Sequence, residues 1–311
     1  MEIAFLVAAH TDAKQLFRLT WSLLEMGDVF IHIDKKNKNP YFFKILDKIA
    51  LLKRNKNEVF ILKNRISVAW AGYSQIKCQY LLFEQALNSH KKYNRFFYLS
   101  GLDYPIFSSN EFDFFLNKYP KTEFVSGYNL TQSTDKKQLE KICLYHFFRD
   151  IPLNHKSILR RAIIGCTKLF LKYIGIRRKP YLIINNIKWN IYFGSQWICV
   201  TRECAKLIME QLQHNKKLEK FFKTTYAPDE LCIPTIVFNS TFSKNALYCQ
   251  NMDFKELARL HYLNYTTHIW TYDEKDYNTI INSKKPFVRK LVSGKSEKLI
   301  RLLEKRKKAI L

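Results

Sequence analysis

The sequence contains little cysteine and none of it in a paired spacing. Seven cysteines occur in 311 residues without any C-x-x-C pair, and several stand inside apolar runs such as Trp197–Val200. This pattern excludes a zinc ribbon and a disulfide framework, which need closely spaced or matched cysteines. We expect buried thiols in a reducing compartment.

Membrane-spanning runs, internal repeats and low-complexity linkers are also missing. No apolar stretch reaches the roughly 20 residues that cross a bilayer. Met1–His10 has no basic segment of the kind that opens a signal peptide. We therefore expect a cytoplasmic protein, soluble or attached to the inner face of the cytoplasmic membrane.

Acidic side chains are scarce relative to basic ones. The 52 Lys and Arg outnumber 27 Asp and Glu, which gives a formal net charge of +25. Such a charge indicates an anionic partner, and nucleic acid, a membrane surface or phosphate-bearing small molecules all fit. The 47% apolar residues suffice for a sizeable core and exclude global disorder.

The basic residues gather in two segments. Residues 156–179 hold eight Lys or Arg and no acid, and residues 284–311 hold eleven against two Glu. Ile158–Ile174 has the pattern of a basic amphipathic helix, which can lie on anionic lipid or simply present a solvated face. Ser296–Lys308 is helical in pattern as well.

The first third of the chain alternates apolar strands with helical periodicity, which predicts an α/β fold around a mostly parallel sheet flanked by helices. The expected strands are Ile3–Ala9, Val29–Ile33, Val59–Leu62 and Arg95–Leu99, and the expected helices are Ala13–Leu24, Phe42–Leu52 and Gln75–Leu87. Ligands of such sheets gather beyond the carboxyl ends of the strands, where His10 and Asp34 lie. Asp103 follows another strand, and either a ligand-binding carboxylate or an ordinary turn explains it.

Two later segments combine polar groups with special backbone positions. Asn190–Thr201 reads as a strand broken at Gly194, after which Gln196 and Trp197 suit a sugar or form a core tryptophan beside a bulge. In the second segment, Asp229 and Glu230 follow Pro228. On these residues alone we expect an acidic first helical turn, with Asp229 as the helix cap.

Taken together, seven short motifs resemble the core-2/I-branching β-1,6-N-acetylglucosaminyltransferase family, which includes peptide O-xylosyltransferases and bacterial members. They occur in the family's order over nearly the whole chain: Ala8–His10, His32–Lys36, Trp70–Ser74, Leu99–Pro105, Gly194–Trp197, Tyr226–Glu230 and Phe287–Lys290. The resemblance implies a GT-A-like nucleotide-sugar fold and an inverting transfer from a UDP-sugar without a metal or other cofactor.

The resemblance also implies roles for individual residues. Glu230 matches the catalytic base and Lys290 the lysine that binds the donor diphosphate, with Arg259 or His261 as candidates for a second cation. The other expected donor-binding residues are His10, Asp34, Trp70, Tyr73, Ser74, Asp103 and Arg289. The expected acceptor-binding residues are Gln196, Trp197 and Tyr226.

The complete prediction is one glycosyltransferase domain over residues 1–283, followed by a basic segment over 284–311. Within the domain we expect a nucleotide-binding part at about 1–125 and an acceptor part at about 126–283. The expected reaction transfers N-acetylglucosamine, or xylose, to a bacterial surface glycan, with a lipid-linked acceptor and peripheral contact to an anionic membrane. The alternative from another class is a basic nucleic-acid- or membrane-binding protein without turnover, which the absence of a recognition motif disfavours for nucleic acid.

Overall fold

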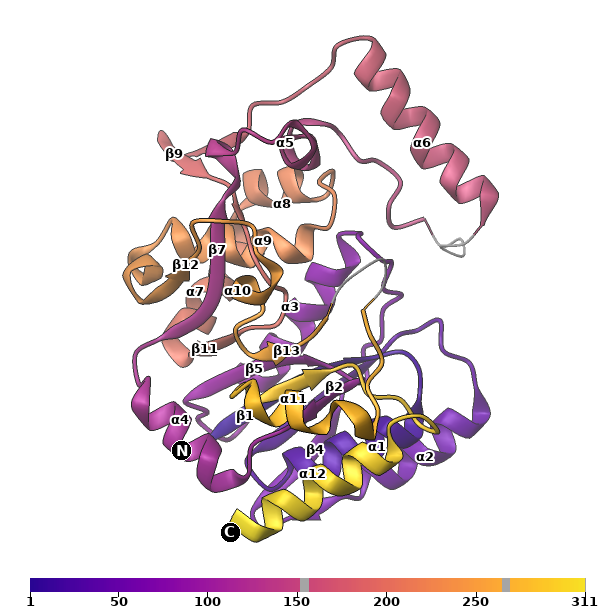
Figure 1. The fold of residues 1–311 in the computed structure, drawn as a ribbon. Coiled ribbons are helices and arrows are strands. Elements are labelled where there is room, and N and C mark those ends of the chain that lie inside the picture. Colours follow the sequence, from indigo (N-terminus) through magenta and orange to yellow (C-terminus); the bar gives the residue numbers. More distant parts are fainter. Residues whose placement is uncertain (152–156, 265–268, 311) are drawn as a thin grey trace.

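A computed structural model describes residues 1–151, 157–264 and 269–310. Its centre is a nine-stranded sheet with the order β10-β7-β11-β5-β1-β2-β4-β3, to which β12 adds beside β7 (Figure 1). The strands are β1 (Ile3–Ala9), β2 (Asp28–Ile33), β3 (Lys53–Arg54), β4 (Asn57–Ile61), β5 (Arg95–Ser100), β7 (Glu123–Asn129), β10 (Tyr192–Phe193), β11 (Cys199–Thr201) and β12 (Ala246–Tyr248).

The strands β5-β1-β2-β4 form a parallel half that is covered by helices on both faces. β1 pairs in parallel with β2 and β5, and β2 with β4. Because side chains alternate along a strand, Leu6 of β1 packs with α3 (Ser74–Leu87) and α7 (Arg202–His214), while its neighbour Phe5 packs with α1 (Ala13–Leu23) and α2 (Pro40–Ala50). The predicted α/β class is confirmed.

The other half of the sheet is mixed. β11 runs antiparallel to β5 and β7, β10 is antiparallel to β7, and β12 is parallel to β7. The expected break at Gly194 separates β10 from β11. A Cβ at Gly194 would lie 2.0 Å from the Ser126 carbonyl oxygen, so only glycine fits this close approach.

A small three-stranded sheet joins three distant parts of the chain. Its order is β13 (His261–Tyr262), β14 (Phe287–Arg289) and β6 (Asp103–Pro105). β14 runs antiparallel to β6, and its register sets Arg289 opposite Asp103. Residues 287–289, which lie in the predicted C-terminal basic segment, thus form the middle strand of this sheet.

The remaining helices lie around these sheets. They are α4 (Ser109–Lys118), α5 (Lys136–Cys143), α6 (Ile158–Tyr173), α8 (Lys216–Phe222), α9 (Cys232–Phe238), α10 (Phe254–Leu257), α11 (Tyr277–Asn282) and α12 (Glu297–Ile310); a hairpin of β8 (Tyr181–Ile184) and β9 (Ile187–Asn190) precedes β10. Both predicted basic helices are confirmed, as α6 and α12. Lys156 and Leu311, at the edges of the two basic segments, lie outside the described residues.

The two basic helices differ in how they meet the body of the protein. α12 lies along the lower edge beside α1, whereas α6 stands away from the sheets at the top of the view (Figure 1). Within the described parts of the chain, no helix has the length and apolar character needed to cross a bilayer.

Candidate active site

The small sheet fixes a buried carboxylate among three donors. The Asp103 side chain is fully buried; its Oδ1 accepts a hydrogen bond from Arg289 Nη1 at 2.7 Å. Its Oδ2 accepts from the backbone N–H of Ser100 at 2.8 Å and lies 3.1 Å from His261 Nε2. Burial alone would raise the pKa of Asp103, but Arg289 and His261 outweigh it and hold this pKa below its ordinary value. Asp103 therefore bonds its own turn and also anchors two side chains from the C-terminal part.

Trp197 forms the floor beneath this cluster. The Arg289 guanidinium lies 4.6 Å from the centre of the Trp197 ring, and His261 packs against the same ring at 5.4 Å. Trp197 is only 8% exposed, so its ring packs under the Arg289 guanidinium and is not free to stack on a sugar. Gln196 beside it is half-buried. The structure thus places Trp197 beside the expected donor residues.

The two candidates for a second cation have different positions. His261 is fully buried against Phe287, and burial lowers its pKa while Asp103 opposes the shift. Arg259 is exposed. Burial and, to a smaller extent, the charge of Arg259 lower the pKa of Lys285 to about 8. The cation that pairs with Asp103 at the edge of this cluster is therefore Arg289.

Loops from the carboxyl ends of β1, β2 and β14 meet at one rim. Partial burial of its ring lowers the pKa of His10, which the Asp34 charge opposes. The charges of Arg289, Lys36 and Lys290 lower this pKa further. Within the described residues, the Lys290 ammonium has neither a salt bridge nor a hydrogen bond.

Asp34 organises the loop after β2. Its Oδ1 accepts hydrogen bonds from the backbone N–H groups of Lys36 at 2.9 Å and Val68 at 3.4 Å, and its Oδ2 lies 3.4 Å from Lys36 Nζ. Asp34 is only 6% exposed. This carboxylate therefore holds two loops together at the rim and leaves the Lys36 side chain half in solvent.

The Trp70–Ser74 segment contains one exposed ring and two buried side chains. Trp70 is 63% exposed and meets Tyr226 edge to face at 6.0 Å, whereas Tyr73 is buried in the core. The Ser74 hydroxyl donates to Asp150 Oδ1 at 2.6 Å, and the Ser74 N–H donates to the same oxygen. Of these three expected donor residues, only Trp70 presents a free surface.

The Pro228–Glu230 segment is a 3₁₀ turn that precedes α9. It follows Ala227, which has a left-handed backbone with φ of 47°. The prediction that Asp229 caps the helix is wrong: α9 begins at Cys232, Leu231 occupies the cap position, and no side chain bonds the cap. The 3₁₀ turn places Asp229 before the start of α9, and its carboxylate instead accepts a hydrogen bond from Gln75 Nε2.

Glu230 has few partners for a half-buried carboxylate. Burial raises the pKa of Glu230 to about 8; the neighbouring Asp229 charge adds to the shift and Lys141 opposes it. Burial also raises the pKa of Asp229 to about 7. Lys141 of α5 lies 4.3 Å from the Phe193 ring, and its own pKa is lowered by burial. A raised carboxylate pKa at the edge of a site is typical of a general base or acid.

The Gly194–Trp197 loop connects the Glu230 turn to the Arg289 cluster. The Gly194 N–H donates to the Glu230 carbonyl at 2.8 Å, and Trp197 lies under Arg289. Three residues of extended chain span at most about 11 Å. The Glu230 turn and the cationic cluster are therefore connected through one short loop.

Three residues near the candidate site are not among the site residues that the sequence predicts. Gln75 joins the Trp70 loop to Asp229, the Lys141 charge opposes the raised pKa of Glu230, and the Arg149 guanidinium lies 4.4 Å from the Tyr226 ring centre. None stands in one of the seven motifs. A pattern search has no signal for them, because each is placed by contacts with residues more than 70 positions away.

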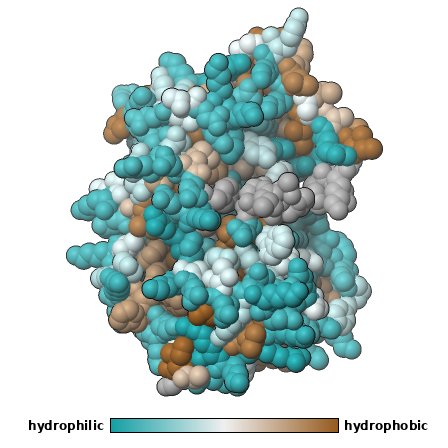
Figure 2. Space-filling model, viewed as in Figure 1, coloured by the Kyte–Doolittle hydropathy of each residue, from teal (hydrophilic) through white to brown (hydrophobic). Residues whose placement is uncertain are grey.

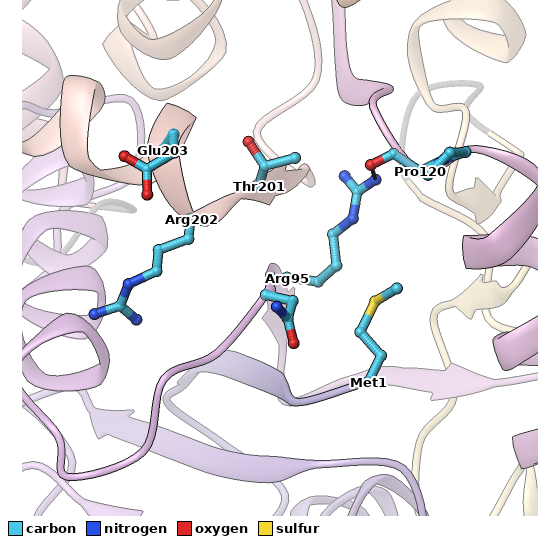
Figure 3. A pocket seen from close by; sticks show the side chains of 7 residues that line it. Met1, Arg95, Pro120, Thr201, Arg202 and Glu203 are labelled. Atoms are coloured by element: carbon cyan, nitrogen blue, oxygen red, sulfur yellow. Dashed lines mark hydrogen bonds between the residues drawn. The ribbon is translucent and has the colours of Figure 1, made fainter.

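A cavity of about 540 Å³ lies away from this site (Figure 3). It is lined by Met1, Asn94, Arg95, Pro120, Thr201, Arg202 and Glu203. These residues lie near the amino ends of β1 and β5, opposite the edge that carries His10 and Asp103. The Arg95 guanidinium donates to the carbonyls of Tyr119, Pro120 and Thr122 at 2.7–2.8 Å, so its hydrogen bonds go to the protein's own backbone.

Comparisons with known proteins identify the family of this chain. The family model "Core-2/I-Branching enzyme" matches residues 3–283. "Xylosyltransferase oxt" of Drosophila melanogaster is 24% identical over 271 residues, which cover 84% of this chain and 28% of that protein. The human N-acetyllactosaminide β-1,6-N-acetylglucosaminyl-transferase is 20% identical over 298 residues, covering 93% and 67%. This chain spans about a quarter of the length of the xylosyltransferases that it matches. A crystal structure of S. aureus TarS 1–349 is 10% identical, with a TM-score of 0.35 over 84% of this chain and 64% of that one.

Proposed function

The chain belongs to the Core-2/I-Branching enzyme family, and we propose that it is an inverting glycosyltransferase acting on a UDP-sugar and a glycan hydroxyl. One observation carries the proposal. Glu230, a carboxylate with a raised pKa, and Arg289, a fixed cation next to Lys290 in sequence, both contact the Gly194–Trp197 loop. A transfer from a nucleotide sugar needs these two groups on opposite sides of the anomeric carbon.

In the proposed reaction Glu230 accepts the proton of the acceptor hydroxyl. The hydroxyl oxygen forms the new bond to the anomeric carbon while the bond from that carbon to the UDP oxygen breaks, and UDP leaves with the electron pair. Lys290 and Arg289 stabilise the charge that develops on the diphosphate. Since attack and departure occur on opposite faces, the anomeric configuration inverts.

We propose that the reaction proceeds without a divalent metal. The support comes from Asp103, because Arg289, His261 and the Ser100 N–H engage both of its oxygens. A carboxylate with its lone pairs used in this way is a poor metal ligand, and Lys290 supplies positive charge for the diphosphate instead.

We propose N-acetylglucosamine as the donor sugar, with xylose as the alternative that the xylosyltransferase relatives raise. The proposed acceptor is a bacterial surface glycan, lipid-linked at the inner face of the cytoplasmic membrane. The two basic segments support this location through their charge.

UDP release across a panel of UDP-sugars, with and without EDTA, tests the proposal. We expect turnover with UDP-N-acetylglucosamine or UDP-xylose that EDTA leaves unchanged. Loss of turnover in EDTA would contradict the metal-free mechanism. Absence of turnover and of thermal stabilisation with every UDP-sugar would contradict the function itself.

A further inference from the structure

Helix α6 presents an apolar face to solvent. Five large apolar side chains of α6 are between 60% and 91% exposed: Ile158, Leu159, Leu169, Phe170 and Tyr173. Their spacing repeats that of an α-helix, so they share one side of it, with the small residues Ala162 and Cys166 between them. We call this set the α6 face. A large exposed apolar patch of this kind is typical of a surface that contacts a membrane, another protein or a ligand.

Positive charge borders the α6 face. Residues 157–179 contain seven Lys or Arg and no acid. Arg161 and Lys172 are exposed at the edge of the α6 face, while Lys168 and Lys172 also lie 3.8 Å and 2.6 Å from Glu140 of α5. An apolar stripe edged by cations complements an anionic lipid surface, where acyl chains lie beneath negative headgroups. A nucleic acid would use the charge but leave the apolar face exposed.

The second basic helix lacks this arrangement. The apolar side of α12 is buried against the body: Leu299 and Leu303 are fully buried, and Arg306 donates to Glu111. α12 has a basic outer surface but little apolar surface to insert. Figure 2 shows hydrophobic side chains at the upper right, where α6 lies in Figure 1, and a largely hydrophilic surface between the few brown patches at the bottom.

We propose that the α6 face inserts into the headgroup region of an anionic bilayer and docks the protein there. The helix is also tied to the site: Arg160 Nη2 donates to the Arg149 carbonyl at 2.6 Å, and the Arg149 guanidinium lies over Tyr226. Docking through α6 therefore holds the acceptor side of the site near the membrane. The benefit to catalysis rests on the proposed function, whereas the docking itself does not.

Vesicle flotation tests the docking without donor or acceptor. The probes are vesicles of phosphatidylcholine alone and of phosphatidylcholine with phosphatidylglycerol. We expect binding to the anionic vesicles only, and a loss of more than about tenfold in the double variant Leu169→Asp/Phe170→Asp. Arg161→Ala should weaken binding about fivefold at low salt. The matched control is Phe114→Asp, because Phe114 of α4 is 72% exposed but lies outside the α6 face.

The native Cys166 allows a second measurement. It is the exposed cysteine among the seven, so a polarity-sensitive thiol probe reports on the α6 face. We expect a blue shift of its emission on anionic vesicles. Circular dichroism melts and turnover with a soluble acceptor check that the double variant is folded and active.

Three outcomes would overturn the docking proposal. They are equal binding of the parent and the double variant to anionic vesicles, binding of RNA without binding of vesicles, and a dimer in solution that the double variant dissociates. Glu230→Gln separates the two proposals, because it should lose turnover and retain full vesicle binding. Retained turnover in that variant would refute the proposed base and leave the docking result standing.

Discussion

Asp103 and Glu230 are two carboxylates of the proposed site, and they lie in opposite electrical surroundings. Asp103 is fully buried, yet two side chains and a backbone N–H engage its oxygens and hold its pKa low. Glu230 is half-buried, its carboxylate has Lys141 as the opposing charge, and burial with Asp229 raises its pKa to about 8. The same chemical group is thus stabilised as an anion at one position and destabilised at the other.

The difference indicates a division of labour. A carboxylate that is fully bonded as an anion binds no proton near neutral pH and serves to hold other groups. A carboxylate whose anion is poorly stabilised takes up a proton readily, as a general base must. We infer that Asp103 positions Arg289, whereas Glu230 performs the proton transfer. Five predictions test this contrast, from the largest expected effect to the smallest.

Glu230→Gln should lower turnover by about 10³-fold, because the amide cannot accept the proton of the acceptor. UDP binding, measured by calorimetry, should stay within about twofold of the parent, since the diphosphate contacts are cationic. Glu203→Gln, which removes an exposed carboxylate from α7, serves as the control. Turnover within tenfold of the parent in Glu230→Gln would refute the assignment.

Asp103→Asn should act mainly on stability. Removing the Asp103 charge leaves the Arg289 guanidinium without a counter-charge and gives His261 a weaker hydrogen-bond acceptor. Breaking such a buried pair costs about 3 kcal/mol. Urea denaturation should show this loss. Exchange of Asp113, an exposed acid of α4, for Asn should leave the free energy of unfolding unchanged. A fully stable Asp103→Asn protein would remove the anchoring role.

Lys290→Ala should weaken binding of the UDP-sugar by about 30-fold, since a hydrogen bond to a charged group is worth about 2 kcal/mol. The protein should keep its stability, because the ammonium has no ion pair within the described residues. Lys290→Arg should recover part of the affinity. Unchanged binding in the Ala variant would assign the diphosphate to other cations.

The pH profile should report Glu230 and not Asp103. Because the base must be ionised, kcat/KM should rise about tenfold per pH unit below pH 8 and level off above it. Asp229→Asn should move the midpoint to lower pH, since the Asp229 charge raises the pKa of Glu230. A profile that is flat between pH 6 and 9 would contradict the raised pKa.

The same shift has a consequence for stability. Glu230 binds its proton more tightly in the folded protein than in the unfolded chain, so folded-state stability falls as pH rises from about 4.5 to 8. Glu230→Gln removes this penalty, and its Tm relative to the parent should be higher at pH 9 than at pH 5.

The sequence by itself determined most of the regular elements, and it supplied the candidates for the site residues. Continuous apolar runs predicted β1 and β5, the helical spacing predicted α1, α6 and α12, and the family motifs pointed to Glu230 and Lys290. These features depend on local periodicity and on short segments, which can be read without knowing what packs against them.

The tertiary structure alone decided the partners. The pairing of Asp103 with Arg289 joins residues 186 positions apart through the register of β14 on β6, and Gln75 draws Asp229 away from the helix cap that its sequence position favoured. Likewise, α6 and α12 have similar basic patterns but differ in the exposure of their apolar sides. The body of the protein covers the apolar side of α12 and leaves that of α6 in solvent. Which neighbour covers a face or completes a charge depends on long-range packing, and no local pattern records it.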